Sequence, residues 1–202
     1  GHTVRVARYS RLLAARLGLS GEQVDLLQQA AILHDIGKIA TPDSVLLKPG
    51  RLSPLDYELI KHHAQAGSAM LAGIAMYREL ATIIRHHHER YDGMGYPDRL
   101  RGPGIPLLAR ILVVADSFDA MTTNRIYKPR KSVDEALAEL QSLSGSQFDP
   151  EVVAAALVAL GGEELPAAVS QLPKNQMEQR RFSYFFSDKL TGLYNEDYLQ
   201  IV

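Results

Sequence analysis

Apolar residues recur at helical spacing along most of the chain, and seven segments follow this pattern. Ser20 and Ser132 each stand three residues before a glutamine or glutamate, as in a capping box. Ser53 and Asp149 each precede a proline, which favours a helix start. We therefore expect helices over residues 4–17, 20–35, 53–71, 77–88, 107–121, 132–143 and 149–161.

The segment 111–115 is apolar on every side, a pattern that would also suit a buried strand. The length of the surrounding segment and its alanines favour a central core helix instead. No other segment suggests a strand ladder. The sequence therefore predicts an all-α fold, a bundle of about seven helices with a short C-terminal linker and tail.

The composition changes after Gly162, and this change divides the chain. We expect one helical domain over 1–162, a linker over 163–181 whose second half suits a helix, and an aromatic and acidic tail over 182–202. The tail is too small to fold alone. Because Gly1 leads directly into a helical pattern, we expect the chain to be part of a longer protein.

The charges of the chain nearly balance, with 22 Lys and Arg against 23 Asp and Glu. The chain therefore lacks the excess of positive charge that is typical of proteins that bind long nucleic acids, although a local cluster of cations can still bind a small anion. The absence of cysteine excludes disulfides and thiolate metal sites. No apolar run approaches the roughly 20 residues that span a bilayer. We expect a cytoplasmic protein with no membrane segment in this chain.

All seven histidines are expected near the ends of predicted helices: His2, His34, His62, His63, His86, His87 and His88. A lone histidine is usually a surface or core residue without a functional role. A run of histidines at the C-terminal end of a helix also interacts favourably with the helix dipole. His34 and Asp35, however, are adjacent, so their side chains would diverge by about 100° and suit two neighbouring metal ions. The combination favours a metal site.

Asp116 is the expected carboxylate partner of these histidines. It follows an apolar run in the most apolar predicted helix, where a carboxylate is costly unless it is paired or metal-bound. Asp119, one turn later, suits either the support of a ligand or only a role as an N-cap or an ion-pair partner.

Imidazole and carboxylate ligands without sulfur suit iron, manganese, zinc, cobalt or nickel, and argue against a calcium or purely magnesium site. Two such ions about 3.5–4 Å apart can activate water and bind both the attacking and the leaving oxygen of a phosphoryl group. The residues therefore predict a multi-metal site that hydrolyses a phosphodiester bond.

The segment 34–38, His-Asp-Ile-Gly-Lys, resembles the HD motif of the HD superfamily of metal-dependent phosphohydrolases. The segment 87–97, His-His-Glu-Arg-Tyr-Asp-Gly-Met-Gly-Tyr-Pro, resembles the motif that distinguishes its HD-GYP subgroup. Residues 42–50 and 115–122 are similar to the same subgroup, so the resemblance covers about residues 1–160. It implies the HD-superfamily fold and hydrolysis of cyclic di-GMP to linear pGpG and then GMP.

The resemblance also implies a set of metal ligands: His2, His34, Asp35, His63, His87, His88 and Asp116. Within this set, Asp35 is expected to bridge two ions and to take part in catalysis. Ala64 follows His63 where the family usually has proline. His62 and His86 fall where the family does not require histidine, so we interpret both as structural. Two or three divalent ions are implied, iron or manganese before zinc, nickel or cobalt; a third ion would need a ligand upstream of His2.

Lys38 is expected near the metals, as a catalytic group that stabilises a phosphate or the leaving oxygen; the alternative is a solvated lysine. The segment 125–128 resembles a family segment whose two cations meet ligand phosphates, although Asn124 and Ile126 replace the usual aspartate and proline. The loop 93–97 would contact substrate, or would dock partner domains. The expected substrate contacts are Lys38, Gly95, Tyr96, Pro97, Arg125 and Lys128.

The tail carries a second resemblance, because residues 188–195 are similar to the opening of a GGDEF domain, the diguanylate cyclase fold. Glu196 and Asp197 stand where arginines are often found. The chain ends before the defining motif, so no cyclase activity follows. Besides a cyclic dinucleotide substrate, the expected partners are a GGDEF-type domain of the parent protein or in trans, and a second copy in a homodimer.

Two other functions remain open. A receptor or docking module would bind the dinucleotide with little hydrolysis, although every matched ligand position is filled. An HD-type hydrolase would act on nucleotides or another phosphoester, although the Gly-Tyr-Pro loop weighs against it.

Overall fold

The computed structural model describes residues 1–46, 48, 52–123 and 130–165. These residues form eight α-helices and three 3-10 helices, with one isolated bridge between Ser144 and Phe148 and no strand. The α-helices are α1 (His2–Arg16), α2 (Gly21–Leu33), α3 (Asp43–Leu46), α4 (Pro54–Ala72), α5 (Arg78–His86), α6 (Leu107–Thr122), α7 (Val133–Ser142) and α8 (Pro150–Ala159). The 3-10 helices are η1 (Ile36–Ala40), η2 (Ala75–Tyr77) and η3 (Gly102–Gly104).

Four helices begin where a polar side chain satisfies a backbone N–H group. Ser20, Ser53 and Ser132 each form a reciprocal capping box with the residue three positions later. The carboxylate of Asp149 accepts a hydrogen bond from the backbone N–H of Glu151. These starts agree with the positions that the sequence predicts.

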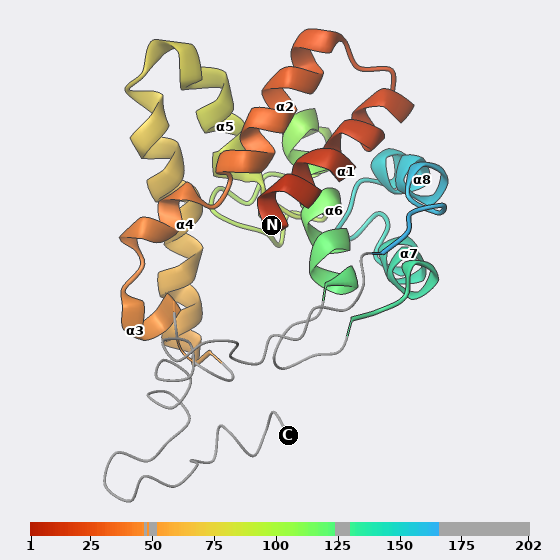
Figure 1. Ribbon diagram of the computed structural model, residues 1–202. Helices are drawn as coiled ribbons and strands as arrows, with labels where there is room; N and C mark the ends of the chain where they lie inside the picture. Colours follow the sequence, from red (N-terminus) through yellow and green to blue (C-terminus); the bar gives the residue numbers. More distant parts are fainter. Residues whose placement is uncertain (47, 49–51, 124–129, 166–202) are drawn as a thin grey trace, which may run out of the picture.

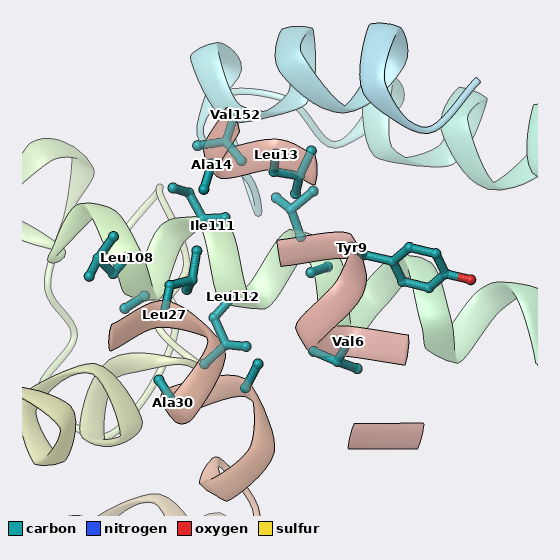
Figure 2. Packing of buried hydrophobic residues seen from close by; sticks show 14 of the residues in the cluster. Val6, Tyr9, Leu13, Ala14, Leu27, Ala30, Leu108, Ile111, Leu112 and Val152 are labelled. Carbon is teal, nitrogen blue, oxygen red and sulfur yellow. The ribbon is translucent and has the colours of Figure 1, made fainter. Parts of the chain in front are cut away.

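The core lies where α1 and α2 pack on α6, and α8 covers α1 and α6 from the other side. Figure 2 shows this cluster, in which Leu13 of α1, Leu27 of α2, Ile111 of α6 and Val152 of α8 gather. α6 is apolar on most sides because it is the central helix of the cluster. In Figure 1, α3, α4 and α5 lie to one side of this core and α7 and α8 to the other.

The structure confirms the all-α fold and the core helix over 111–115, but it shifts some boundaries. α2 ends at Leu33, so His34 caps the helix and Asp35 precedes η1. α5 ends at His86, and His87 follows as its C-cap. The sequence predicted longer helices here because the apolar spacing continues past these residues. The spacing does not indicate where the chain must turn to pack against another helix. The four-residue α3 was not predicted.

No helix in the described part of the chain is both long and apolar enough to cross a membrane. Of the expected linker and tail, only residues 163–165 belong to the described chain. The GGDEF-like segment 188–195 lies outside the described residues.

Candidate metal centre

The seven residues predicted as metal ligands come together at the ends and along the inner faces of five helices. His2 begins α1, His34 caps α2, and Asp35 follows it. His63 lies within α4, and Asp116 within α6. Two groups have ligand atoms within 4.8 Å of one another: the first group is His2, His34 and Asp116, and the second group is His63, His87 and His88.

Asp35 lies between the first and second groups. Its Oδ2 atom is 3.6 Å from Nε2 of His34, and its Oδ1 atom is 3.6 Å from Nε2 of His63. Each carboxylate oxygen therefore faces a different group. This is the arrangement that a carboxylate shared by two cations requires.

Backbone carbonyls orient three of the imidazoles in the same way. The Nδ1 atom of His34 lies 2.8 Å from the carbonyl oxygen of Ala31. The Nδ1 atoms of His63 and His87 each lie 2.6 Å from the carbonyl oxygen of the residue three positions earlier. Since a carbonyl oxygen only accepts, Nδ1 carries the proton and donates it. The free lone pair is then on Nε2, which turns towards the cluster.

The contact between His63 and His87 tests whether these residues fit a metal ion. Their Nε2 atoms lie 3.3 Å apart. With both Nδ1 protons given to carbonyls, the two Nε2 atoms meet as acceptors and cannot hydrogen-bond to each other. A shared cation would satisfy both lone pairs, so the donor set fits a metal.

Burial keeps the second group uncharged. Burial, followed by the nearby His34, lowers the pKa of His87 to about 3. Burial also lowers the pKa of His88 well below its usual value and that of His63 to a smaller extent. Neutral imidazoles bind metal without first losing a proton, so the second group is ready for a cation near neutral pH.

The turn after Asp35 is held against α4 by a close backbone approach. A Cβ atom at Gly37 would lie 2.0 Å from the carbonyl oxygen of His63 and 2.4 Å from the backbone nitrogen of Gly67. Only glycine permits this contact. It places Asp35 beside His63, two residues that are far apart in the sequence.

Asp119 supports His2 from behind. Its Oδ2 atom lies 2.7 Å from Nδ1 of His2, and its carboxylate also accepts hydrogen bonds from Nε and Nη2 of Arg5 at 2.5 and 3.0 Å. Nε2 of His2 meanwhile lies 3.4 Å from Asp116. The Asp119 hydrogen bond raises the pKa of His2, against the effect of burial. The geometry fits both the expected support of a ligand, through His2, and the expected ion pair, through Arg5.

Lys38 lies at the edge of the cluster. Its ammonium group donates to Oδ2 of Asp35 at 2.6 Å, and the side chain is 38% exposed. The lysine is thus close to the cluster and still partly exposed to solvent, and its exposed side leaves room for an anion.

The loop after α5 is packed back on the helix end that carries His88. The backbone N–H of Tyr96 donates to the carbonyl oxygen of His88 at 3.2 Å, and the two rings stack with centroids 4.9 Å apart. A Cβ atom at Gly95 would lie 2.2 Å from the backbone nitrogen of Arg90. Gly95 therefore serves a close approach within the protein. The peptide bond between Tyr96 and Pro97 is cis.

Glu89 is a loop-supporting residue that sequence reasoning missed. Its side chain is fully buried, and one oxygen accepts the backbone N–H of Asp98 at 2.7 Å. His86, Glu89 and Asp98 also lie close enough to hold an ion. However, both carboxylate oxygens of Asp98 accept hydrogen bonds from Arg85, so we interpret this trio as structural. The burial of Glu89 depends on tertiary packing, so the sequence pattern does not indicate it.

One expectation about the histidines is wrong. His62 and His63 lie in the middle of α4 and not near a helix end, because that helix runs on to Ala72. His62 is exposed and belongs to neither ligand group, whereas His86 is buried beside Glu89. Arg125 and Lys128, two of the expected substrate contacts, lie outside the described residues.

Comparisons with known proteins agree with this fold and with the HD motif. A family model described as HD domain matches residues 1–152. The cyclic di-GMP phosphodiesterase response regulator RpfG of Xanthomonas campestris is 48% identical over 155 residues, which are 76% of this chain and 41% of that protein. A cyclic di-GMP phosphodiesterase of Thermotoga maritima is 46% identical over 158 residues, 77% of this chain and 43% of that protein. The chain thus spans less than half the length of these curated relatives.

A solved structure of a cyclic GMP-AMP specific phosphodiesterase of Vibrio cholerae has the same fold, with a TM-score of 0.63 at 24% identity. The match covers 90% of this chain and 48% of that one. The family model alone covers well over half of the chain. Together with the His-Asp pair at the junction of α2 and η1, it shows that the chain belongs to the HD domain family.

Proposed function

We propose that this chain is a metal-dependent phosphodiesterase that hydrolyses cyclic di-GMP to linear pGpG and then to GMP. The observation that carries the proposal is the position of Asp35, with one oxygen towards the first group and the other towards the second. A carboxylate between two imidazole-rich groups suits a pair of cations that act together on one phosphoryl group. The relatives named above as cyclic di-GMP phosphodiesterases support the choice of substrate.

In this proposal the metal ligands are His2, His34, Asp35, His63, His87, His88 and Asp116. Their donor set without sulfur suits iron or manganese, and less so zinc, nickel or cobalt; two or three ions would be held. When bound, the ions supply Lewis acidity that activates water and offsets the charge of the phosphate. In the second group, the neutral imidazoles of His63 and His87 hold their orientation through the backbone carbonyls described above.

Lys38 has two roles in this proposal. Without substrate it neutralises Asp35. With substrate, its partly exposed ammonium would turn towards a non-bridging phosphate oxygen or the leaving oxygen, where a fixed cation stabilises the charge that develops in the transition state. We also assign substrate contacts to Gly95, Tyr96 and Pro97, and phosphate contacts to Arg125 and Lys128 on the basis of the sequence resemblance.

The domain limits remain part of the proposal. We assign the phosphodiesterase to residues 1–162, a linker to 163–181 and the start of a GGDEF-like domain to 182–202. The last assignment rests only on the similarity of residues 188–195. The proposal of a GGDEF-type partner rests on the same similarity, and the homodimer stays a prediction.

The experiment uses the purified chain, loaded in turn with Fe²⁺ and Mn²⁺ and incubated with cyclic di-GMP. Chromatography of the products and elemental analysis of bound metal are the two measurements. Asp35→Asn should lose both the turnover and at least part of the metal, because its carboxylate faces both ligand groups. Asp25→Asn, an exposed aspartate on α2, is the matched control and should change neither. Absence of turnover with every metal, or undiminished turnover in Asp35→Asn, contradicts the proposal.

A further inference from the structure

A cavity of about 480 Å³ lies beside the metal centre, between α4 and the loop that follows α5. Its lining includes Tyr57, Glu58, Lys61, His62 and Gln65 of α4 and Tyr96 of the loop. None of the seven predicted metal ligands lines it. Its volume falls within the range of small-molecule sites.

Tyr96 forms a wall shared by the cavity and the metal centre. One side of its ring stacks on His88, a member of the second group, and the residue also lines the cavity. His62, another lining residue, is adjacent to His63 of the second group. A ligand whose phosphate lies at the metal centre would therefore extend one of its ends into the cavity.

The α4 wall consists of side chains that recur at helical spacing. Tyr57, Lys61 and Gln65 follow one another at intervals of four residues and so share a face of the helix. Tyr96 lines the cavity from the side of the loop. Two tyrosine rings thus border the cavity, and aromatic rings are the usual platforms for nucleobases.

Lys61 lies between the two rings and is paired with Glu58. Its ammonium is 5.3 Å from the centre of the Tyr57 ring and 5.6 Å from that of the Tyr96 ring. The same ammonium lies 2.6 Å from a carboxylate oxygen of Glu58. A cation and a carboxylate therefore stand side by side next to two aromatic faces. The Glu58 side chain is 64% exposed, so it remains accessible to a ligand.

We infer that this cavity binds one guanine base of the substrate, an inference that rests on the proposed function. Guanine presents an acceptor, O6, beside two donors, N1–H and the N2 amino group. Lys61 would donate to O6, and the two oxygens of Glu58 would accept from N1–H and the N2 amino group. The base would stack on Tyr57 or Tyr96. The Lys61–Glu58 pair thus matches the whole edge of guanine.

Adenine fits the same pair less well. It has one donor, the N6 amino group, and one acceptor, N1, on this edge, and it lacks an amino group at C2. One carboxylate oxygen of Glu58 would lose its partner. Since a bidentate contact to a base discriminates against the wrong base, the site should favour guanine by about tenfold or more.

The first test measures binding alone. Metal-free chain, kept in a chelator to prevent hydrolysis, is titrated calorimetrically with cyclic di-GMP, 3′3′-cGAMP and cyclic di-AMP. One guanine is enough to fill the cavity, so we expect 3′3′-cGAMP to bind nearly as well as cyclic di-GMP, and cyclic di-AMP about tenfold or more weakly. Equal affinities for all three ligands, or no binding of cyclic di-GMP, would overturn the inference.

Variants of the cavity residues show which side chain distinguishes guanine from adenine. Glu58→Gln should bring the affinities for cyclic di-GMP and cyclic di-AMP to within about threefold, because the amide keeps one acceptor oxygen and sets its NH2 donor against a donor of guanine. Tyr57→Ala should weaken all three ligands alike, by about tenfold, because stacking does not depend on the base. Glu22→Gln, an exposed glutamate on α2, is the matched control and should keep the wild-type ratio. If Glu58→Gln also keeps that ratio, the inference is wrong.

A second measurement separates this inference from the proposed function. Turnover by the Mn²⁺-loaded chain is compared for cyclic di-GMP and for bis(p-nitrophenyl) phosphate, a diester without a base. Glu58→Gln should lower the ratio of kcat/KM for cyclic di-GMP to that for the base-free diester by about tenfold. Guanine-selective binding without any turnover would overturn the proposed function and support the base site. Turnover in which Glu58→Gln keeps the wild-type ratio of kcat/KM would support the proposed function and overturn the base site.

Discussion

Tyr96 and His88 are joined twice, by a hydrogen bond between backbone N–H and carbonyl and by stacking of their rings. Tyr96 therefore connects the loop 93–97 to the metal centre. Any ligand that disturbs this loop also reaches a proposed metal ligand. The pairing gives a physical reason why a Gly-Tyr-Pro loop and a histidine pair occur in one sequence segment.

Replacement of Tyr96 should separate the contribution of its ring from that of its hydroxyl group. Tyr96→Ala removes the ring on which His88 rests, so we expect kcat/KM for cyclic di-GMP to fall by about tenfold or more. Tyr96→Phe keeps the ring and should lose less. Steady-state kinetics and bound-metal analysis of both variants provide the measurement. Equal losses in the two variants would show that the ring stack does not matter.

The close approach at Gly37 should make this position intolerant of any side chain. Gly37→Ala would place a methyl group against the backbone of α4, and we expect a loss of about 3 kcal/mol in the free energy of unfolding, with weaker metal binding. Urea denaturation of the metal-free protein measures the stability. Gly73→Ala, where a Cβ atom would meet open space, is the matched control and should change stability little. A tolerated Gly37→Ala would contradict the geometry of the turn.

The support of His2 by Asp119 should influence metal affinity without direct contact to the metal. Asp119→Asn keeps the size of the side chain but removes the charge that orients His2 and pairs with Arg5. Loss of such a supporting carboxylate typically weakens metal binding by about 10- to 100-fold. Competition with a chromogenic chelator measures this affinity. Wild-type affinity in Asp119→Asn would mean that the pair serves stability alone.

The buried second group should make the metal-free protein sensitive to acid. The pKa of His87 is lowered to about 3 in the folded state, below its unfolded value of about 6.5. The unfolded chain therefore binds the proton first, and the contribution of His87 to stability is complete above pH 6.5 and lost as the pH falls towards 3. Each unit of pKa shift corresponds to about 1.4 kcal/mol.

Urea denaturation of the metal-free protein between pH 7 and pH 4 tests this expectation. The free energy of unfolding should fall with pH, and the fall should be shallower in His87→Gln. His62→Gln, which replaces an exposed histidine, serves as the control and should retain the steep fall. Parallel curves for wild type and His87→Gln would contradict the neutral, buried state of His87.

Much of this protein could be predicted from local sequence signals. Capping residues such as Ser20 and Ser53 place helix starts because the cap and its partner are only three residues apart. The apolar pattern of α6 identifies the central helix and makes Asp116 conspicuous. The residue types of the predicted ligands can also be read from the sequence, whereas the kind of metal that they hold stays a prediction.

Other features depend on contacts between distant segments. The division of the ligands into two groups, the orientation of Asp35 between them and the support of His2 by Asp119 all join residues from different helices. The cavity beside Tyr96 likewise forms only where α4 faces the loop after α5. Spacing along the chain determines local geometry alone. Which side chains meet is decided when buried surfaces pack and backbones approach closely, as Gly37 and His63 do.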